Sequence, residues 1–146
     1  MQVLPYVLLM LKNKIYANFA RKQNKKITGP YPLHAQIDLT YRCNLNCVHC
    51  YCKGFEGGDE LTTAEWKGAI DQIRSAGTMW LTITGGEPML RKDFFEIYSY
   101  AKKKGFFVTI FTNGILLDTE AIRYLAKFPP YAIEISLYGI NEDTYQ

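Results

Sequence analysis

Three apolar segments recur along the chain with the spacing of alternating strands and helices. Ile83, Ile110 and Ile135 occupy equivalent places in these segments, and they lie 27 and 25 residues apart. That distance is too long for a hairpin, but it fits a strand, a crossover helix and the next strand. Consecutive βα units form a parallel sheet, which is either open and doubly wound or curved into a barrel. In both cases the chemistry gathers at the carboxyl ends of the strands.

A further strand and the intervening helices follow from the same kind of pattern. Residues 33–40 alternate apolar and polar side chains, which predicts a strand ahead of the other three. Thr62 and Glu65 form a capping-box signature at the start of a helix. Apolar side chains at helical spacing predict three helices, with stripes made of Trp66, Ala69, Ile70 and Ile73, then Phe94, Ile97, Tyr98 and Ala101, then Ala121, Tyr124, Leu125 and Phe128. The chain is thus predicted to hold about four βα units.

The first 30 residues differ in charge from the rest. Residues 1–37 contain six of the 17 lysines and arginines and none of the 14 acidic residues. A helix over residues 5–19 is followed by Gly29, Pro30 and Pro32, which mark a boundary. We interpret residues 1–30 as a basic helical segment that either packs outside the main domain or binds a membrane or partner through an amphipathic face. Residues 31–146 are interpreted as the N-terminal part of a longer core, because the chain stops inside a fourth helix pattern.

All four cysteines lie within ten residues: Cys43, Cys47, Cys50 and Cys52. Disulfides between residues this close would constrain little of the chain, and no secretory signal precedes them. We therefore expect a reducing cytosol, where clustered thiols are usually metal ligands or redox groups. Thiolates suit zinc or an iron–sulfur cluster. Zinc would need Cys52 or His49 as a fourth ligand, whereas a cubane held by three cysteines leaves one iron free to bind a small molecule.

Composition narrows the remaining classes. Hydrophobic residues make up 48% of the chain and charged residues 21%, which is ordinary for a globular protein and argues against disorder. No run of about 18 apolar residues is present, so no membrane span is predicted. Lys102, Lys103 and Lys104 belong to a solvated helix end, and no nucleic-acid partner is expected.

The arrangement Cys43-x3-Cys47-x2-Cys50 after a first strand resembles the radical S-adenosylmethionine (SAM) superfamily. His49 matches the aromatic position before the third cysteine, and Gly85-Gly86-Glu87-Pro88 matches the motif at the end of the family's second strand. The segments 112–114 and 135–139 resemble strand ends of the subgroup that matures peptides and cofactors, many of whose members carry a cysteine-rich (SPASM-type) extension. The resemblance covers residues 33–146 and implies the first four βα units of a partial TIM barrel.

The resemblance also implies a role for each matching residue. Cys43, Cys47 and Cys50 would bind three irons of a 4Fe–4S cluster, and SAM would chelate the fourth iron. The methionine part of SAM would lie along Gly85, Gly86, Glu87 and Pro88, and the adenine against Tyr51. Polar contacts to the ribose or carboxylate would come from Thr112, Asn113 and Ser136. No side chain is assigned as a catalytic group, because the cofactor carries the hard step.

In members of this family the reduced cluster cleaves SAM to a 5′-deoxyadenosyl radical, which abstracts hydrogen from a substrate. The resemblance thus implies an oxidoreductase-like enzyme in the full-length protein. It also implies an electron donor such as a flavodoxin or ferredoxin. The substrate expected from the subgroup is a peptide or a cofactor precursor.

Two alternatives to the enzyme remain open. One is a non-catalytic binding module whose cysteine loop holds zinc or a purely structural or electron-transfer cluster. The other is an inactive fragment that keeps the motif without turnover. In either reading of the loop, Cys52 is expected to be a bystander or local modulator, and His49 a packing residue rather than a ligand.

Overall fold

The computed structural model describes residues 33–55 and 58–139. These residues all belong to one compact unit, Leu33–Gln146. The predicted basic helical segment over residues 1–30 and the predicted helix after Asn141 lie outside the described residues. They therefore stay predictions.

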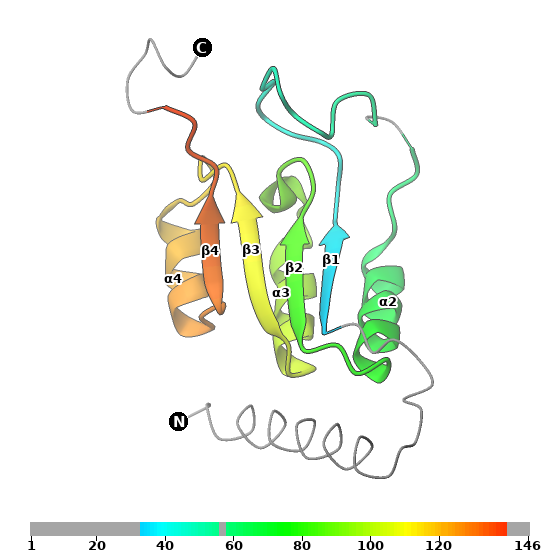
Figure 1. Cartoon of the computed structure of the whole chain (residues 1–146). Helices are drawn as coiled ribbons and strands as arrows, with labels where there is room; N and C mark the ends of the chain where they lie inside the picture. Colours follow the sequence, from blue (N-terminus) through cyan, green and yellow to red (C-terminus); the bar gives the residue numbers. More distant parts are fainter. Residues whose placement is uncertain (1–32, 56–57, 140–146) are drawn as a thin grey trace, which may run out of the picture. The chain divides into compact units, whose positions relative to one another are not determined.

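The described chain alternates strands and helices throughout (Figure 1). The strands are β1 (His34–Asp38), β2 (Trp80–Thr84), β3 (Phe107–Thr112) and β4 (Ala132–Ile135). The helices are α2 (Thr63–Ser75), α3 (Phe94–Lys103) and α4 (Thr119–Lys127), with a short 3₁₀ helix, η1 (Pro88–Leu90), after β2. The four strands are parallel and lie side by side in sequence order, β1-β2-β3-β4.

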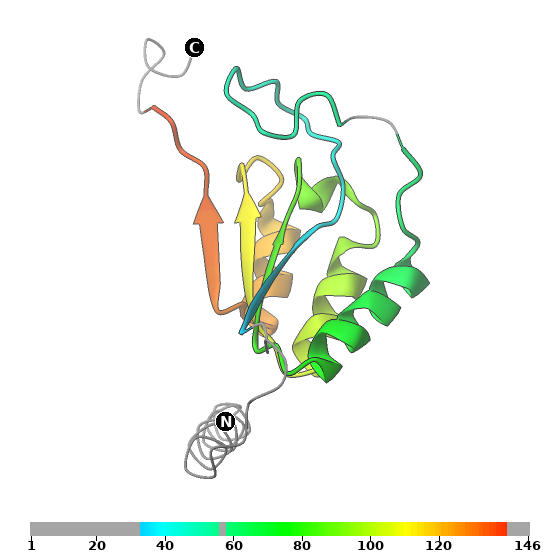
Figure 2. The same cartoon turned by 45° about the vertical axis from the view of Figure 1, so that its right-hand side comes forward.

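Helices α2, α3 and α4 all cover the same face of the sheet (Figure 2). A doubly wound sheet carries helices on both faces, whereas a barrel carries all of them outside one curved sheet. Sequential strand order and one-sided helices therefore select the barrel arrangement from the two that the sequence left open. The described part of the chain corresponds to a partial barrel.

The helices form where their stripes and caps predict. Thr62 and Glu65 make the reciprocal hydrogen bonds of a capping box at the start of α2. Gly77 follows α2 and Gly105 follows α3, with φ of 92° and 85°, the left-handed conformation that favours glycine after a helix. The stripe predicted for α3 is buried along its whole length: Phe94, Ile97, Tyr98 and Ala101.

The strand register corrects one expectation. Ile83 lies opposite Ile110 as predicted, but Ile110 lies opposite Ile133 rather than Ile135. The crossover through α4 is the shorter one, since α4 has 9 residues and α3 has 10. Strand side chains alternate between faces with a period of two, so this two-residue shift leaves both isoleucines on the helix-covered face.

The core lies between the sheet and the three helices. Leu81, Ile83, Val108 and Ile110 on the central strands are fully buried there, together with Ile70 of α2. No helix in the described ranges has both the length and the apolar character needed to cross a membrane. The opposite sheet face and the carboxyl ends of the strands are left for the loops described next.

Candidate cofactor site

The cysteine loop is held against the end of β2 by backbone hydrogen bonds. The Gly86 N–H donates to the Thr40 carbonyl at 2.7 Å, and the Glu87 N–H donates to the Arg42 carbonyl at 2.9 Å. A Cβ on Gly85 would overlap the Thr40 carbonyl oxygen, and a Cβ on Gly86 would overlap that of Arg42. The two glycines are therefore required because two backbones touch, and this contact sets the position from which Cys43 leaves the sheet.

The four thiols differ in exposure. Cys43 is exposed, Cys47 and Cys50 are half-buried, and Cys52 is buried; all four are free. No three His, Cys, Asp or Glu side chains in the described ranges are close enough together to hold a single metal ion. Thiols that share one zinc must converge on it, whereas the thiols of a cubane each bind a different iron. The spread of Cys43, Cys47 and Cys50 therefore fits a cluster of several irons.

A cavity of about 310 Å³ joins the cysteine loop to the strand ends. It is lined by the three motif cysteines and by residues from the ends of all three remaining strands: Thr84, Gly85, Gly86, Phe111, Thr112, Asn113, Ser136 and Tyr138, with Leu45, His49 and Tyr51 from the loop. The volume lies in the range of small-molecule sites. Soft thiol donors on one wall and backbone and polar groups on the other fit a cluster with a polar ligand beside it.

Most of the predicted site residues meet in this cavity, and two do not. The lining includes Tyr51, Thr112, Asn113 and Ser136, as well as both glycines of the motif. Glu87 and Pro88 are buried behind the cavity wall and are not among the lining residues. The structure thus separates the front half of Gly85-Gly86-Glu87-Pro88 from its rear half.

The Glu87 carboxylate ties the ends of β2 and β3 together. It is fully buried, and it accepts hydrogen bonds from the Met89 N–H at 3.0 Å, the Thr112 hydroxyl at 2.9 Å and the Asn113 N–H at 2.8 Å. A buried carboxylate needs such donors to offset its lost hydration. Its side chain therefore organises the strand ends around the cavity.

Tyr51 and Cys52 contact the same carbonyl from the far side of the loop. The Tyr51 hydroxyl and the Cys52 thiol both donate to the Gly85 carbonyl oxygen at 3.3 Å. Burial raises the pKa of the Cys52 thiol, which keeps it protonated as a donor. Cys52 does not line the cavity, in agreement with its expected place outside the ligand set.

His49 and Tyr138 bring the cysteine loop into contact with the chain after β4. Their rings meet edge to face with centroids 4.3 Å apart. Both residues line the cavity. His49 was expected to pack over the cofactors, but its partner Tyr138 was not foreseen, since 89 residues separate the two.

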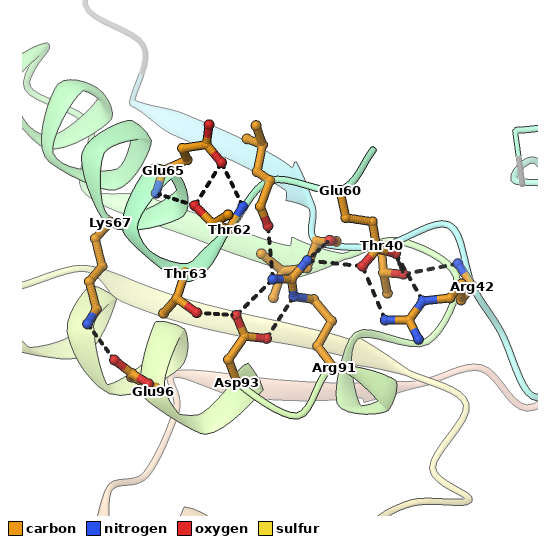
Figure 3. A network of polar contacts seen from close by, with 12 residues as sticks. Thr40, Arg42, Glu60, Thr62, Thr63, Glu65, Lys67, Arg91, Asp93 and Glu96 are labelled. Atoms are coloured by element: carbon orange, nitrogen blue, oxygen red, sulfur yellow. Dashed lines mark hydrogen bonds and ion pairs between the residues drawn. The ribbon is translucent and has the colours of Figure 1, made fainter. Parts of the chain in front are cut away.

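A buried arginine holds the neck of the cysteine loop, where the loop leaves β1 and where it returns to α2 (Figure 3). Arg91 donates to the Leu39 carbonyl at 3.2 Å on one side and to the Leu61 carbonyl at 3.0 Å on the other. It also donates to Glu60 at 3.2 Å and, through two nitrogens, to Asp93 at 2.8 and 2.9 Å. A planar guanidinium suits such a multidentate site, whereas an ammonium would serve only part of it.

Glu60 extends this network to the residue before Cys43. Its carboxylate accepts two hydrogen bonds from Arg42, each at 3.1 Å, and one from the Thr40 hydroxyl. The hydrogen bonds from Arg42 hold the pKa of Glu60 below its usual value. Sequence reasoning missed Glu60 and Arg91. The charged run Arg91-Lys92-Asp93, which directly follows a buried turn, was the available signal.

A larger hollow of about 500 Å³ lies on the other side of this neck, lined by Tyr41, Phe55, Glu60, Trp66 and neighbouring residues. None of the four cysteines lines it, and Glu60 is already committed to Arg42 and Arg91. We therefore place the candidate site in the smaller cavity.

Comparisons with known proteins agree with this assignment. Residues 37–146 match the family model of the radical SAM superfamily. Fe-coproporphyrin III synthase from Methanosarcina barkeri is 43% identical over 107 residues, which are 72% of this chain and 27% of that protein. PqqA peptide cyclase from Bradyrhizobium diazoefficiens is 33% identical over 113 residues, 76% of this chain and 30% of that protein.

Among solved structures, SuiB of Streptococcus suis bound to S-adenosylmethionine superposes with a TM-score of 0.68. It is 25% identical, and the match covers 77% of this chain and 26% of that one. The chain thus spans between about a quarter and a third of the length of each of these proteins.

Proposed function

The chain belongs to the radical SAM superfamily, and on that premise we propose that it forms the cofactor-binding part of a radical SAM enzyme. The family's cofactors are a 4Fe–4S cluster and SAM. The observation that carries the proposal is the shared cavity, in which Cys43, Cys47 and Cys50 face Gly85 and Gly86. When bound, these cofactors supply the reductive cleavage that forms a 5′-deoxyadenosyl radical able to abstract hydrogen from a substrate.

The chain's own residues bind and orient the cofactors in this proposal. Cys43, Cys47 and Cys50 are the cluster ligands, and the backbone at Gly85 and Gly86 supplies acceptors for the amino group of SAM. Tyr51 borders the adenine, while Thr112 and Ser136 offer hydroxyls to the ribose or carboxylate. Glu87 and Pro88 act from behind by shaping the wall. Holding reactants in place and excluding water is the protein's usual share of such chemistry.

We propose a peptide or a cofactor precursor as the substrate. Relatives named as PqqA peptide cyclase and mycofactocin maturase support a peptide, and the SuiB structure with the precursor peptide SuiA supports the fold of such an enzyme. Relatives named as Fe-coproporphyrin III synthase and AdoMet-dependent heme synthase support a tetrapyrrole precursor. An electron donor such as a flavodoxin or ferredoxin completes the proposal, and clustered free thiols favour a reducing cytoplasm.

Spectroscopy of the reconstituted protein tests this function. The chain is purified without oxygen, supplied with iron and sulfide, reduced, and examined by electron paramagnetic resonance (EPR) with and without SAM. We expect a cubane signal that SAM alters, that is lost in a Cys43→Ala, Cys47→Ala, Cys50→Ala variant and that survives in Cys52→Ala. Stoichiometric zinc without a cluster would instead support the non-catalytic binding module.

Product analysis separates binding from turnover. Formation of 5′-deoxyadenosine by the reduced, SAM-loaded chain would show that these residues suffice to cleave SAM. A SAM-sensitive cluster without 5′-deoxyadenosine would identify this chain as a binding part that needs the remaining length of its relatives for activity.

A further inference from the structure

The Asn113 side chain reaches from the end of β3 to the first cysteine of the loop. Its Nδ2 donates to Asn44 Oδ1 at 2.8 Å and lies 3.8 Å from Cys43 Sγ, within hydrogen-bond range for sulfur. The amide carries two hydrogens, so it can serve both acceptors at once. A side chain predicted to contact SAM is thus engaged by the cysteine loop.

The orientation of this amide follows from its other contacts. Asn113 Oδ1 accepts a hydrogen bond from the Ile115 N–H at 3.0 Å, which requires the oxygen to face the turn. The Asn113 backbone N–H is itself fixed by Glu87 at 2.8 Å. With the oxygen and the backbone both held, the NH₂ group must face Cys43 and Asn44.

Cys43 Sγ has a second donor from within the loop. The Leu45 N–H lies 3.4 Å from the sulfur. Two N–H groups therefore surround the one motif cysteine that is exposed. Hydrogen bonds to cluster sulfurs stabilise the more negative, reduced state and so raise the reduction potential.

We propose that Asn113 is a positioning residue that orients Cys43 and raises the reduction potential of the cluster through its N–H···S hydrogen bond. This inference rests on the proposed function, because it needs a cluster at Cys43. It assigns Asn113 to the cluster side of the cavity rather than to the ribose. The chain of contacts Glu87–Asn113–Cys43 would then link the Gly85–Pro88 segment to the cluster ligand.

The test is an EPR-monitored redox titration of the reconstituted full chain. Asn113→Ala removes the amide, while Asn113→Asp keeps Oδ1 for the Ile115 turn and replaces the donor with a negative charge. We expect both variants to shift the midpoint potential to more negative values, with the larger shift in Asn113→Asp. Asn46→Ala, which removes an exposed amide from the same loop, is expected to leave the potential unchanged.

The outcomes distinguish this inference from the proposed function. Equal potentials in wild type, Asn113→Ala and Asn113→Asp, at equal iron content, would overturn the role of Asn113 alone. A wild-type chain that takes up no cluster would overturn both proposals before any variant is compared. If Asn113→Ala fails to fold, Asn113→Asp decides the matter, since it retains the turn contact.

Discussion

Gly85 and Gly86 lie at the point where the cysteine loop presses on the end of β2. Gly85 has a φ of 134°, in the region that side chains rarely adopt, and an added Cβ would overlap the Thr40 carbonyl. Gly68 offers a contrast, because it lies exposed within α2 with no atom near an added Cβ. Glycines of one chain thus differ in whether packing requires them.

Replacing each glycine by alanine should therefore change the free energy of unfolding in opposite directions. Gly85→Ala is expected to destabilise by about 2–4 kcal/mol through overpacking and backbone strain. Gly68→Ala is expected to stabilise by about 0.5–1 kcal/mol, because alanine loses less entropy in a helix. Urea unfolding followed by circular dichroism measures both. A neutral Gly85→Ala would show that the loop can lift from β2 without cost.

Glu87 is the fully buried carboxylate whose two oxygens serve three donors. Glu87→Gln places an NH₂ group against either the Met89 N–H or the Asn113 N–H. Two donors then face each other, which should cost about 1–3 kcal/mol of stability. Glu96→Gln breaks an ion pair to Lys67 on the helix surface and should cost at most about 0.5 kcal/mol. Equal midpoints for the two variants in urea would contradict this role.

The neck of the cysteine loop is the element that most depends on charge. Hydrogen bonds from Arg91 lower the pKa of Asp93 from 3.8 to about 2, and those from Arg42 lower that of Glu60. Groups whose pKa is depressed by folding stabilise the protein above their unfolded pKa. That contribution is lost as the pH falls through the folded values.

Stability should therefore decrease as the pH is lowered from about 5 to about 2. Asp93→Asn removes one titrating carboxylate and should flatten this decrease, with a contribution on the order of 2 kcal/mol for the Asp93 shift. Gly68→Ala changes stability without touching a carboxylate and should keep the wild-type slope. Urea unfolding at a series of pH values gives the comparison. Parallel slopes for Asp93→Asn and wild type would refute the assignment.

The elements themselves were readable from local patterns, while their connections were not. The capping box of Thr62 and the stripe of α3 involve residues three or four apart, and both were predicted and confirmed. The opposition of Ile110 and Ile133 depends on the length of a crossover, which the pattern gave with an error of two residues. Arg91 contacts Leu39 and Glu60, 52 and 31 positions away, and no periodicity encodes such pairs.

The candidate site followed from sequence to a similar extent. Parallel strands bring their carboxyl ends to one edge, so the meeting of Cys43, Gly85, Thr112 and Ser136 was predictable from topology. Which of these side chains face the cavity was not, because Glu87 turns inward toward backbone N–H groups that only the assembled sheet supplies.

At the scale of the whole molecule, β4 is the least covered strand. In the described part of the chain it pairs only with β3, and Ile133 and Ile135 are 38% and 54% exposed. Parallel sheets usually have both faces covered, and an exposed apolar edge strand tends to pair with another chain. We expect this 146-residue chain to self-associate through β4.

A charge on β4 should reduce that association. Ile135→Lys introduces a charge of the kind that protects natural edge strands. Ile122→Lys is the matched control, because Ile122 is 55% exposed but lies on α4, where no strand edge is available. Sedimentation velocity over a range of concentrations should show a weaker shift toward larger species for Ile135→Lys than for wild type or Ile122→Lys. Equal reduction by both variants would point to general surface hydrophobicity instead of edge pairing, because the two substitutions remove similar apolar surface.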